Sequence, residues 1–169
     1  EETRKNSMGL EAWKERVAAI GARGTPEVME VIQGEIAYIE SGWPEGLPRG
    51  VVHADLFPDN IFVTDGHVSG VIDFYFSATE FLAYDLAIAV NAWCFDENHE
   101  FVTARWESLM DGYSCLYKMS DEEREAFNLL LRGAALRFLV SRLYNFVFHD
   151  PAAFVSPKDP AEYLKKLEF

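Results

Sequence analysis

The run Val51-Val52-His53-Ala54-Asp55-Leu56-Phe57-Pro58-Asp59-Asn60 decides the fold of this chain, because an apolar strand pattern enters a polar loop there. Two further strand patterns follow at 61–63 and 68–72, and an Asp-Gly turn signal between them predicts a β-hairpin. The second of these strands ends on Asp73. A hairpin returns the chain toward its start, so we expect Asp73 to lie near Asn60, although 13 residues separate them.

Three side chains of this segment carry oxygen atoms that suit phosphoryl transfer. A carboxylate at Asp55 can accept a hydrogen bond from an alcohol as it attacks a phosphate. Asn60 offers a neutral oxygen and Asp73 an anionic one, a pair that suits Mg²⁺ while the ion keeps phosphate and water ligands. His53 is expected to brace the loop by hydrogen bonding.

Helical patterns surround the hairpin on both sides. Apolar residues spaced by three and four predict two helices before it, at about 8–20 and 26–41. Further helices are predicted after it at 81–95, 101–118, 121–148 and 161–167. Ser120 and Glu123 have the spacing of a capping box at the start of the long helix. The expected fold is mainly α with a small β-hairpin insert.

The composition and net charge of the chain limit the kinds of molecule that it can bind. The 169 residues are 49% hydrophobic and carry a net charge of −13, so the chain buries a core and repels nucleic-acid backbones and anionic membrane surfaces. Neither nucleic acid nor a membrane is an expected partner. Cys94 and Cys115 predict buried thiols in a reducing cytoplasm. Residues 51–100 contain nine acids and no Lys or Arg, which fits either a solvated acidic face or a cation site.

The catalytic-segment pattern resembles a known superfamily. Residues 52–60 and 70–76 are similar to the catalytic and metal-binding loops of the protein-kinase-like superfamily, and closest to its aminoglycoside phosphotransferase and choline kinase branch. Tyr75 stands where protein kinases have glycine, which disfavours a protein kinase. The same segments, with later ones, resemble the bacterial homoserine kinase family of the aminoglycoside-phosphotransferase-like type. The later segments are 83–87, 91–95, 132–138, 141–144 and 158–164.

This resemblance implies a C-terminal lobe of a protein-kinase-like (α+β) fold over residues 1–169. The catalytic and metal loop would span 51–77 and the helical substrate subdomain 78–169. The N-terminal nucleotide lobe would be absent from this chain and would be its partner in the full-length protein, so little activity is expected from the chain alone.

The resemblance also implies a reaction, the transfer of the ATP γ-phosphate to the hydroxyl of L-homoserine, a step of threonine biosynthesis. It assigns the catalytic aspartate to Asp55 beside His53, and the Mg²⁺ ligands at the nucleotide phosphates to Asn60 and Asp73. By the same resemblance, Asp85 supports the backbone of the catalytic loop.

The acceptor side stays open at this level. A homoserine carboxylate would suit an arginine, and both Arg137 and Arg142 either bind substrate or pair with the surplus acids. Tyr144 shares a helix face with Arg137, and Trp93 either lines the pocket or belongs to the core. Other acceptors within the same fold are an aminoglycoside, choline or methylthioribose. A non-catalytic binding lobe is a further alternative, and a metallohydrolase is disfavoured because few histidines are near.

Overall fold

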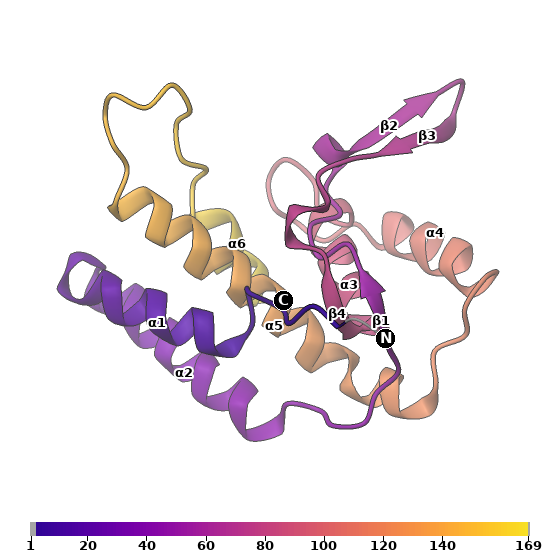
Figure 1. Cartoon of the computed structure of the whole chain (residues 1–169), viewed down its shortest axis with the longest axis horizontal. Helices are drawn as coiled ribbons and strands as arrows, with labels where there is room; N and C mark the ends of the chain where they lie inside the picture. The colour runs from indigo at the N-terminus through magenta and orange to yellow at the C-terminus, as the bar shows by residue number, and fades with distance from the viewer. Residues whose placement is uncertain (1–2, 169) are drawn as a thin grey trace. The chain divides into compact units, whose positions relative to one another are not determined.

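The computed structural model describes residues 3–168, and the chain forms two compact units. Among the described residues, unit 1 comprises 3–7 and 44–131, and unit 2 comprises 8–43 and 132–168. The long helix α5 (Asp121–Val147) begins in unit 1 and ends in unit 2 (Figure 1).

Unit 1 holds the strands, which form two small antiparallel sheets within the described residues. One sheet pairs β1 (Arg49–Val52) with β4 (Ala78–Phe81), and the other pairs β2 (Ile61–Thr64) with β3 (His67–Val71). The helices of this unit besides the start of α5 are α3 (Leu82–Trp93), α4 (Thr103–Ser114) and two short 3-10 helices, Pro58–Asn60 and Phe74–Phe76. Most of α3 is buried, so it forms the centre of the unit.

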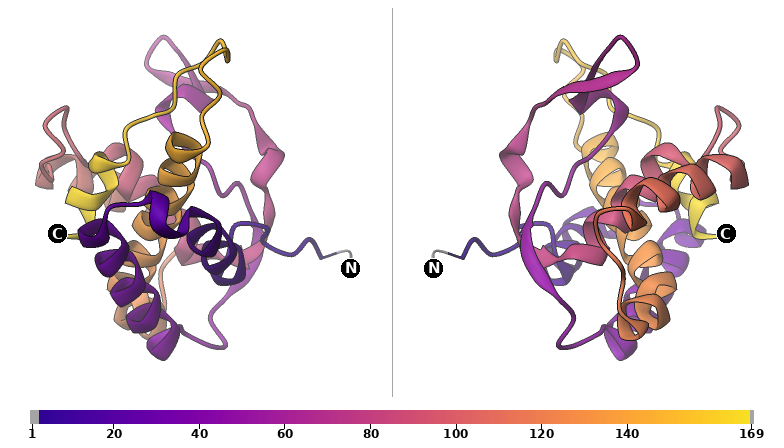
Figure 2. Two further views of the ribbon diagram at one scale, coloured as in Figure 1. Left: turned by 90° about the vertical axis from the view of Figure 1, so that its left-hand side faces the viewer. Right: turned by 90° about the vertical axis from the view of Figure 1, so that its right-hand side faces the viewer.

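The predicted hairpin is present as β2 and β3. Asp65 has φ 51° and Gly66 has φ 77°, and two consecutive left-handed residues are what a two-residue type I′ turn requires. The hairpin reaches out beyond β1 and β4 (Figure 2). Its side chains are correspondingly exposed, with Val63 at 60% and Val68 at 66%.

The prediction of a single hairpin insert was wrong, because β1 pairs with the unpredicted strand β4. Val51 lies opposite Thr79, and Val52 lies opposite Ala78. The pairing joins segments far apart in sequence, so no local turn signal announces it. Ala78 and Phe81 are buried, which adds an apolar contribution to the pairing.

Unit 2 is helical and contains the predicted helices α1 (Leu10–Ile20), α2 (Pro26–Gly42) and α6 (Ala161–Leu167) besides the second part of α5. The ring of Trp13 meets that of Trp43 edge to face, with centroids 6.2 Å apart. Gly133 of α5 packs against this pair, since a Cβ there would come within 2.6 Å of the Trp43 ring. Only glycine therefore allows α5 to approach so closely.

The capping box at the start of α5 is also present. The backbone N–H of Ser120 donates to Glu123 Oε2 at 2.8 Å, and the N–H of Glu123 donates to Ser120 Oγ at 3.2 Å. The Tyr117 hydroxyl donates to the same carboxylate, which is completely buried. A buried carboxylate with two donor groups around it, the Ser120 N–H and the Tyr117 hydroxyl, is well satisfied.

The expectation of two buried thiols holds for Cys94 and was wrong for Cys115, which is exposed. Cys115 caps the C-terminus of α4, and the next residue, Leu116, is 95% exposed. Cys115 and Leu116, at the end of the helix, therefore face solvent although both side chains are apolar. In residues 3–168, no helix has the length and apolar character needed to cross a membrane.

Candidate active site

The loop after β1 is held by the carboxylate of Asp85, which lies in the first turn of α3. Asp85 Oδ2 accepts a hydrogen bond from the His53 N–H at 3.0 Å, and Oδ1 accepts one from the Ala54 N–H at 2.7 Å. Ala54 has φ 63°, a left-handed conformation that costs a non-glycine residue about 1–2 kcal/mol. The two hydrogen bonds to the carboxylate offset this cost.

His53 ties this loop to the end of the hairpin. Its Nδ1 accepts a hydrogen bond from the Asp55 N–H at 3.2 Å, so in the neutral ring the proton sits on Nε2. Nε2 then donates to the carbonyl oxygen of Ile72 at 2.9 Å. The imidazole also packs against the Phe74 ring, with centroids 4.6 Å apart. Both nitrogens are therefore engaged in bracing the loop.

The side chain of Asn60 orients Asp55. Asn60 Nδ2 donates to the Asp55 carbonyl oxygen at 2.8 Å and lies 3.4 Å from Asp55 Oδ2. Both partners are acceptors, so the amide nitrogen must face them. The amide oxygen of Asn60 consequently points away from Asp55.

The hairpin brings Asp73 back beside Asn60, as its strand pattern predicted for the backbone. The Ile72 N–H donates to the Asn60 carbonyl oxygen at 3.0 Å, and Asp73 follows directly in a left-handed conformation with φ 62°. Asp73 is exposed, and its Oδ1 accepts a long 3.4 Å hydrogen bond from the Tyr75 N–H.

An amide oxygen and a carboxylate oxygen on adjoining segments fit a hard cation such as Mg²⁺, which accepts oxygen ligands and keeps several waters. Within residues 3–168, no group of three or more His, Cys, Asp or Glu side chains is arranged to hold a metal ion. A cation at Asn60 and Asp73 would therefore take most of its ligands from water and phosphate.

Trp93, at the end of α3, contacts the same loop. Its Nε1 donates to the Leu56 carbonyl oxygen at 2.9 Å. Beside it lies a largely apolar pocket of about 940 Å³ within unit 1. Trp93 thus both braces the loop and contributes to the pocket wall. The other walls come from the loop, the hairpin, α3 and α4, through Leu56, Pro58, Ile61, Val68, Ala89, Ala92, Phe95, Asp96, Glu97, Ala104, Arg105, Ser108 and Leu109.

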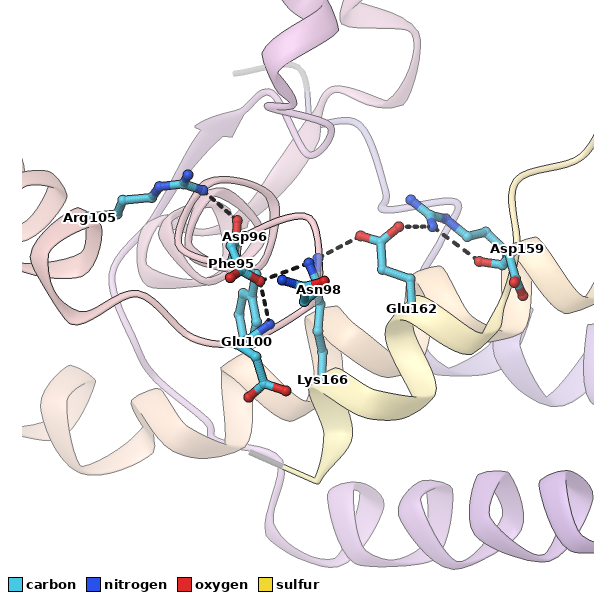
Figure 3. Close-up of polar contacts among 9 residues, drawn as sticks. Phe95, Asp96, Asn98, Glu100, Arg105, Asp159, Glu162 and Lys166 are labelled. Atoms are coloured by element: carbon cyan, nitrogen blue, oxygen red, sulfur yellow. Dashed lines mark hydrogen bonds and ion pairs between the residues drawn. The ribbon is translucent and has the colours of Figure 1, made fainter.

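The polar rim of this pocket is fixed by a tight turn after α3. Asp96 Oδ1 accepts hydrogen bonds from the N–H groups of Asn98 and Glu100, both at 2.9 Å (Figure 3). These backbone hydrogen bonds lower the pKa of Asp96 below its ordinary value. Arg105 of α4 donates to the Phe95 carbonyl oxygen at 2.6 Å, which anchors α4 to the same turn.

The residues of unit 2 that the sequence suggested for acceptor binding, Arg137, Arg142 and Tyr144, have different contacts. Arg142 forms an ion pair with Glu162, which also accepts a hydrogen bond from Lys166 at 2.6 Å (Figure 3). Burial alone would raise the pKa of Glu162, but the hydrogen bonds from the two cations hold it below its ordinary value. Arg142 is therefore engaged by an acid, one of the two roles left open by the sequence.

Arg137 and Tyr144 lie elsewhere on α5. The Arg137 side chain is only 1% exposed, and its guanidinium lies 4.6 Å from the centroid of the Phe138 ring. The Tyr144 ring packs against Phe148, with centroids 4.7 Å apart.

Sequence reasoning missed Arg16 of α1, whose Nη1 donates to Ser141 Oγ at 2.6 Å. A signal for it exists, since Arg16 falls three residues after Trp13 and beside Val17, next to the buried stripe of the helix. An arginine at such a position is half-buried, so it is a better candidate for a binding residue than an arginine on the solvent face.

A protein-family model described as the phosphotransferase enzyme family matches residues 2–118 of the chain. This chain belongs to the phosphotransferase enzyme family. The match includes the loop after β1, the hairpin, Asp73, Asp85 and Trp93, so it contains every candidate site residue of unit 1 that was named from the sequence.

Curated relatives of this phosphotransferase chain carry the name homoserine kinase. The protein from Gluconacetobacter diazotrophicus is 48% identical over 98% of the chain and 53% of its own length. Those from Xanthobacter autotrophicus and Rhodospirillum rubrum are each 44% identical, over 98% and 99% of the chain and 53% of their own length. The chain thus spans about half the length of the curated relatives it matches.

Proposed function

We propose that the full-length protein containing this chain transfers the γ-phosphoryl group of ATP to the hydroxyl of L-homoserine in a Mg²⁺-dependent reaction. The observation that carries the proposal is the orientation of Asp55 by Asn60, in a loop that Asp85 holds from behind. The relatives named homoserine kinase, at 44% identity or more, support the choice of acceptor.

Asp55 is the residue that meets the acceptor hydroxyl. As the acceptor oxygen bonds to phosphorus and the bond to the ADP oxygen breaks, the hydroxyl proton passes to the Asp55 carboxylate. The hydrogen bond from Asn60 Nδ2 limits the rotation of that carboxylate before the reaction. Holding a reacting group in place removes part of the entropic cost of the step.

Asn60 has a second role through its amide oxygen, which it shares with the Asp73 carboxylate. Together the two oxygens would hold Mg²⁺ at the nucleotide phosphates. Bound ATP would supply the phosphoryl group, and bound Mg²⁺ would offset the charge on the phosphate oxygens. Asp85 and His53 act as positioning residues, since each contacts the loop backbone.

The chain is proposed to be the C-terminal lobe of a protein-kinase-like fold, with residues 51–77 as the catalytic and metal loop and 78–169 as the helical substrate part. Its length, about half that of its relatives, supports an N-terminal lobe that completes the nucleotide site in the full-length protein. We place this reaction in threonine biosynthesis in the cytoplasm.

ADP release by the full-length protein, measured with L-homoserine, choline and an aminoglycoside as acceptors, tests the proposal. We expect kcat/KM for homoserine to exceed the others by at least about 100-fold, since a site built for one set of polar groups rejects molecules that lack them. A preference for choline or the aminoglycoside would contradict the choice of acceptor. The chain without its N-terminal lobe should release ADP at only a small fraction of the full-length rate.

A further inference from the structure

Arg16 makes hydrogen bonds to neutral partners only, as far as residues 3–168 are concerned. Its Nη1 donates to Ser141 Oγ at 2.6 Å, and its Nη2 lies 3.2 Å from Met8 Sδ. No ion pair joins Arg16 to a carboxylate of the described residues, although the chain has 28 acids and 15 basic residues. Other arginines are paired with acids, in Arg49–Glu80, Arg124–Asp121, Arg132–Glu35 and Arg142–Glu162.

The surroundings of this guanidinium disfavour its charge. Burial, followed by the charge of Arg137, lowers the pKa of Arg16. Arg137 comes from α5 and Arg16 from α1, two helices of unit 2. A half-buried cation without a carboxylate partner is disfavoured unless an anion binds beside it, and, among the described residues, this applies to Arg16.

Ser141 fixes the direction of the Arg16 side chain. Its hydroxyl donates to the Arg137 carbonyl oxygen at 2.8 Å, one turn back on α5, so its oxygen is left to accept from Arg16. One N–H of the guanidinium is thereby held in place. The ring of Tyr144, whose centroid is 5.9 Å from Arg16 Cζ, flanks the same group. A planar guanidinium held in this way is prepared to meet a carboxylate with two parallel hydrogen bonds.

We propose that Arg16 binds the carboxylate of a small amino acid, with Ser141 as the residue that positions it. The proposal rests on the proposed function, because L-homoserine is an amino acid. The bound amino acid is either the acceptor itself or a second molecule that regulates the enzyme. The chemistry recognised is the same in both cases, and the experiment distinguishes the two sources.

Binding of L-2-aminobutyrate to the full-length protein, followed by calorimetry, tests the proposal without any turnover. This probe has the carboxylate and ammonium of homoserine but no hydroxyl, so it binds without reacting. n-Propylamine, which lacks the carboxylate, is the matched probe. We expect Arg16→Gln to weaken L-2-aminobutyrate binding by about 10- to 100-fold, the loss typical of a charge-assisted hydrogen bond, and to leave propylamine unchanged.

Arg23→Gln is the control variant. Arg23 lies in the same unit with its guanidinium 5.1 Å from the centroid of the Phe148 ring, so it also places a cation beside an aromatic ring. The Arg23→Gln variant should bind L-2-aminobutyrate with the affinity of the parent protein. Ser141→Ala should weaken binding by a few-fold, and Arg16→Lys should restore only part of the affinity because an ammonium lacks the planar fork. These two variants also test the proposal if Arg16→Gln does not fold.

Competition with the substrate identifies the source. If the acceptor is the ligand, L-2-aminobutyrate competes with homoserine and Arg16→Gln raises the homoserine KM far more than it lowers kcat. If a regulator is the ligand, Arg16→Gln leaves the homoserine KM unchanged and abolishes a non-competitive effect of the probe. Equal binding of the probe by the parent protein and both Arg16 variants would overturn the proposal. Failure of the parent to phosphorylate homoserine would overturn the proposed function, while the calorimetric result would still decide the carboxylate site.

Discussion

The side-chain amide of Asn60 donates to Asp55 at two points, the carbonyl oxygen at 2.8 Å and Oδ2 at 3.4 Å. The same group that restrains the carboxylate presents its own oxygen on the other side. One residue thus connects the proposed proton acceptor with the proposed metal position.

Asn60→Asp separates these two roles. The substitution keeps an oxygen ligand, removes the N–H donor and places a carboxylate against Asp55, so the two charges repel. In the full-length protein we expect kcat to fall by at least about 10-fold, with little loss of Mg²⁺ affinity. A Mg²⁺ titration of ADP release measures both quantities. Asn145→Asp, an exposed position on α5, is the control, and an unchanged kcat for Asn60→Asp would contradict the assigned role.

Asp85→Asn tests the support behind the loop. Asp85 accepts from two backbone N–H groups, and an amide that turns its oxygen toward one of them turns its own N–H groups toward the other. The unfolding free energy should fall by about 1–3 kcal/mol, and kcat should fall with it. Denaturant unfolding and ADP release check the two effects. Asp111→Asn, on the exposed side of α4, should change neither, and the account fails if the two variants behave alike.

The capping box predicts a stability effect away from the site. Ser120→Ala removes the hydroxyl that accepts from the Glu123 N–H, and a lost helix cap costs about 1 kcal/mol. Glu123→Ala should cost more, because it also leaves the Ser120 N–H and the Tyr117 hydroxyl without their carboxylate partner. Denaturant unfolding of the full-length protein measures both. Glu125→Ala is the exposed control, and a smaller loss for Glu123→Ala than for Ser120→Ala would be the contrary result.

Tyr113 predicts a decline of stability in alkali. Burial, followed by the charge of Glu123, raises the pKa of Tyr113 to about 12. The folded chain therefore favours the neutral phenol, a contribution that is complete below the ordinary tyrosine pKa near 10 and is lost as pH rises toward about 12. Denaturant unfolding measured across this range should show the decline, and Tyr113→Phe should make it shallower. An identical decline in the two proteins would exclude Tyr113 as its source.

Local signals in the sequence were sufficient for the hairpin and for most helices. Asp65 and Gly66 announce the turn because only a few residue types accept a left-handed backbone there. The strand β4 (Ala78–Phe81) could not be predicted in this way, because its partner β1 is distant in sequence and a short strand without a neighbouring turn has no periodic signal.

The parts of the candidate site that follow from the hairpin could also be predicted from the sequence. The backbone contact between Ile72 and Asn60 follows from the hairpin, whereas the support role of Asp85 stays a prediction. The left-handed backbone of Ala54 was not foreseen, because alanine does not favour that conformation and the loop is held in it by Asp85. Arg16 escaped notice because its partner Ser141 lies 125 residues away.

Single-turnover transfer of the labelled γ-phosphoryl group from ATP to L-homoserine by the full-length protein tests the central claim most directly. Asp55→Asn should slow the transfer by at least about 100-fold, the usual contribution of a positioned base, while the protein remains folded. Asp65→Asn makes the same chemical change at the hairpin turn, where asparagine also accepts the left-handed backbone, and should transfer at the parent rate. Transfer by Asp55→Asn within about threefold of the parent would remove Asp55 from its assigned role.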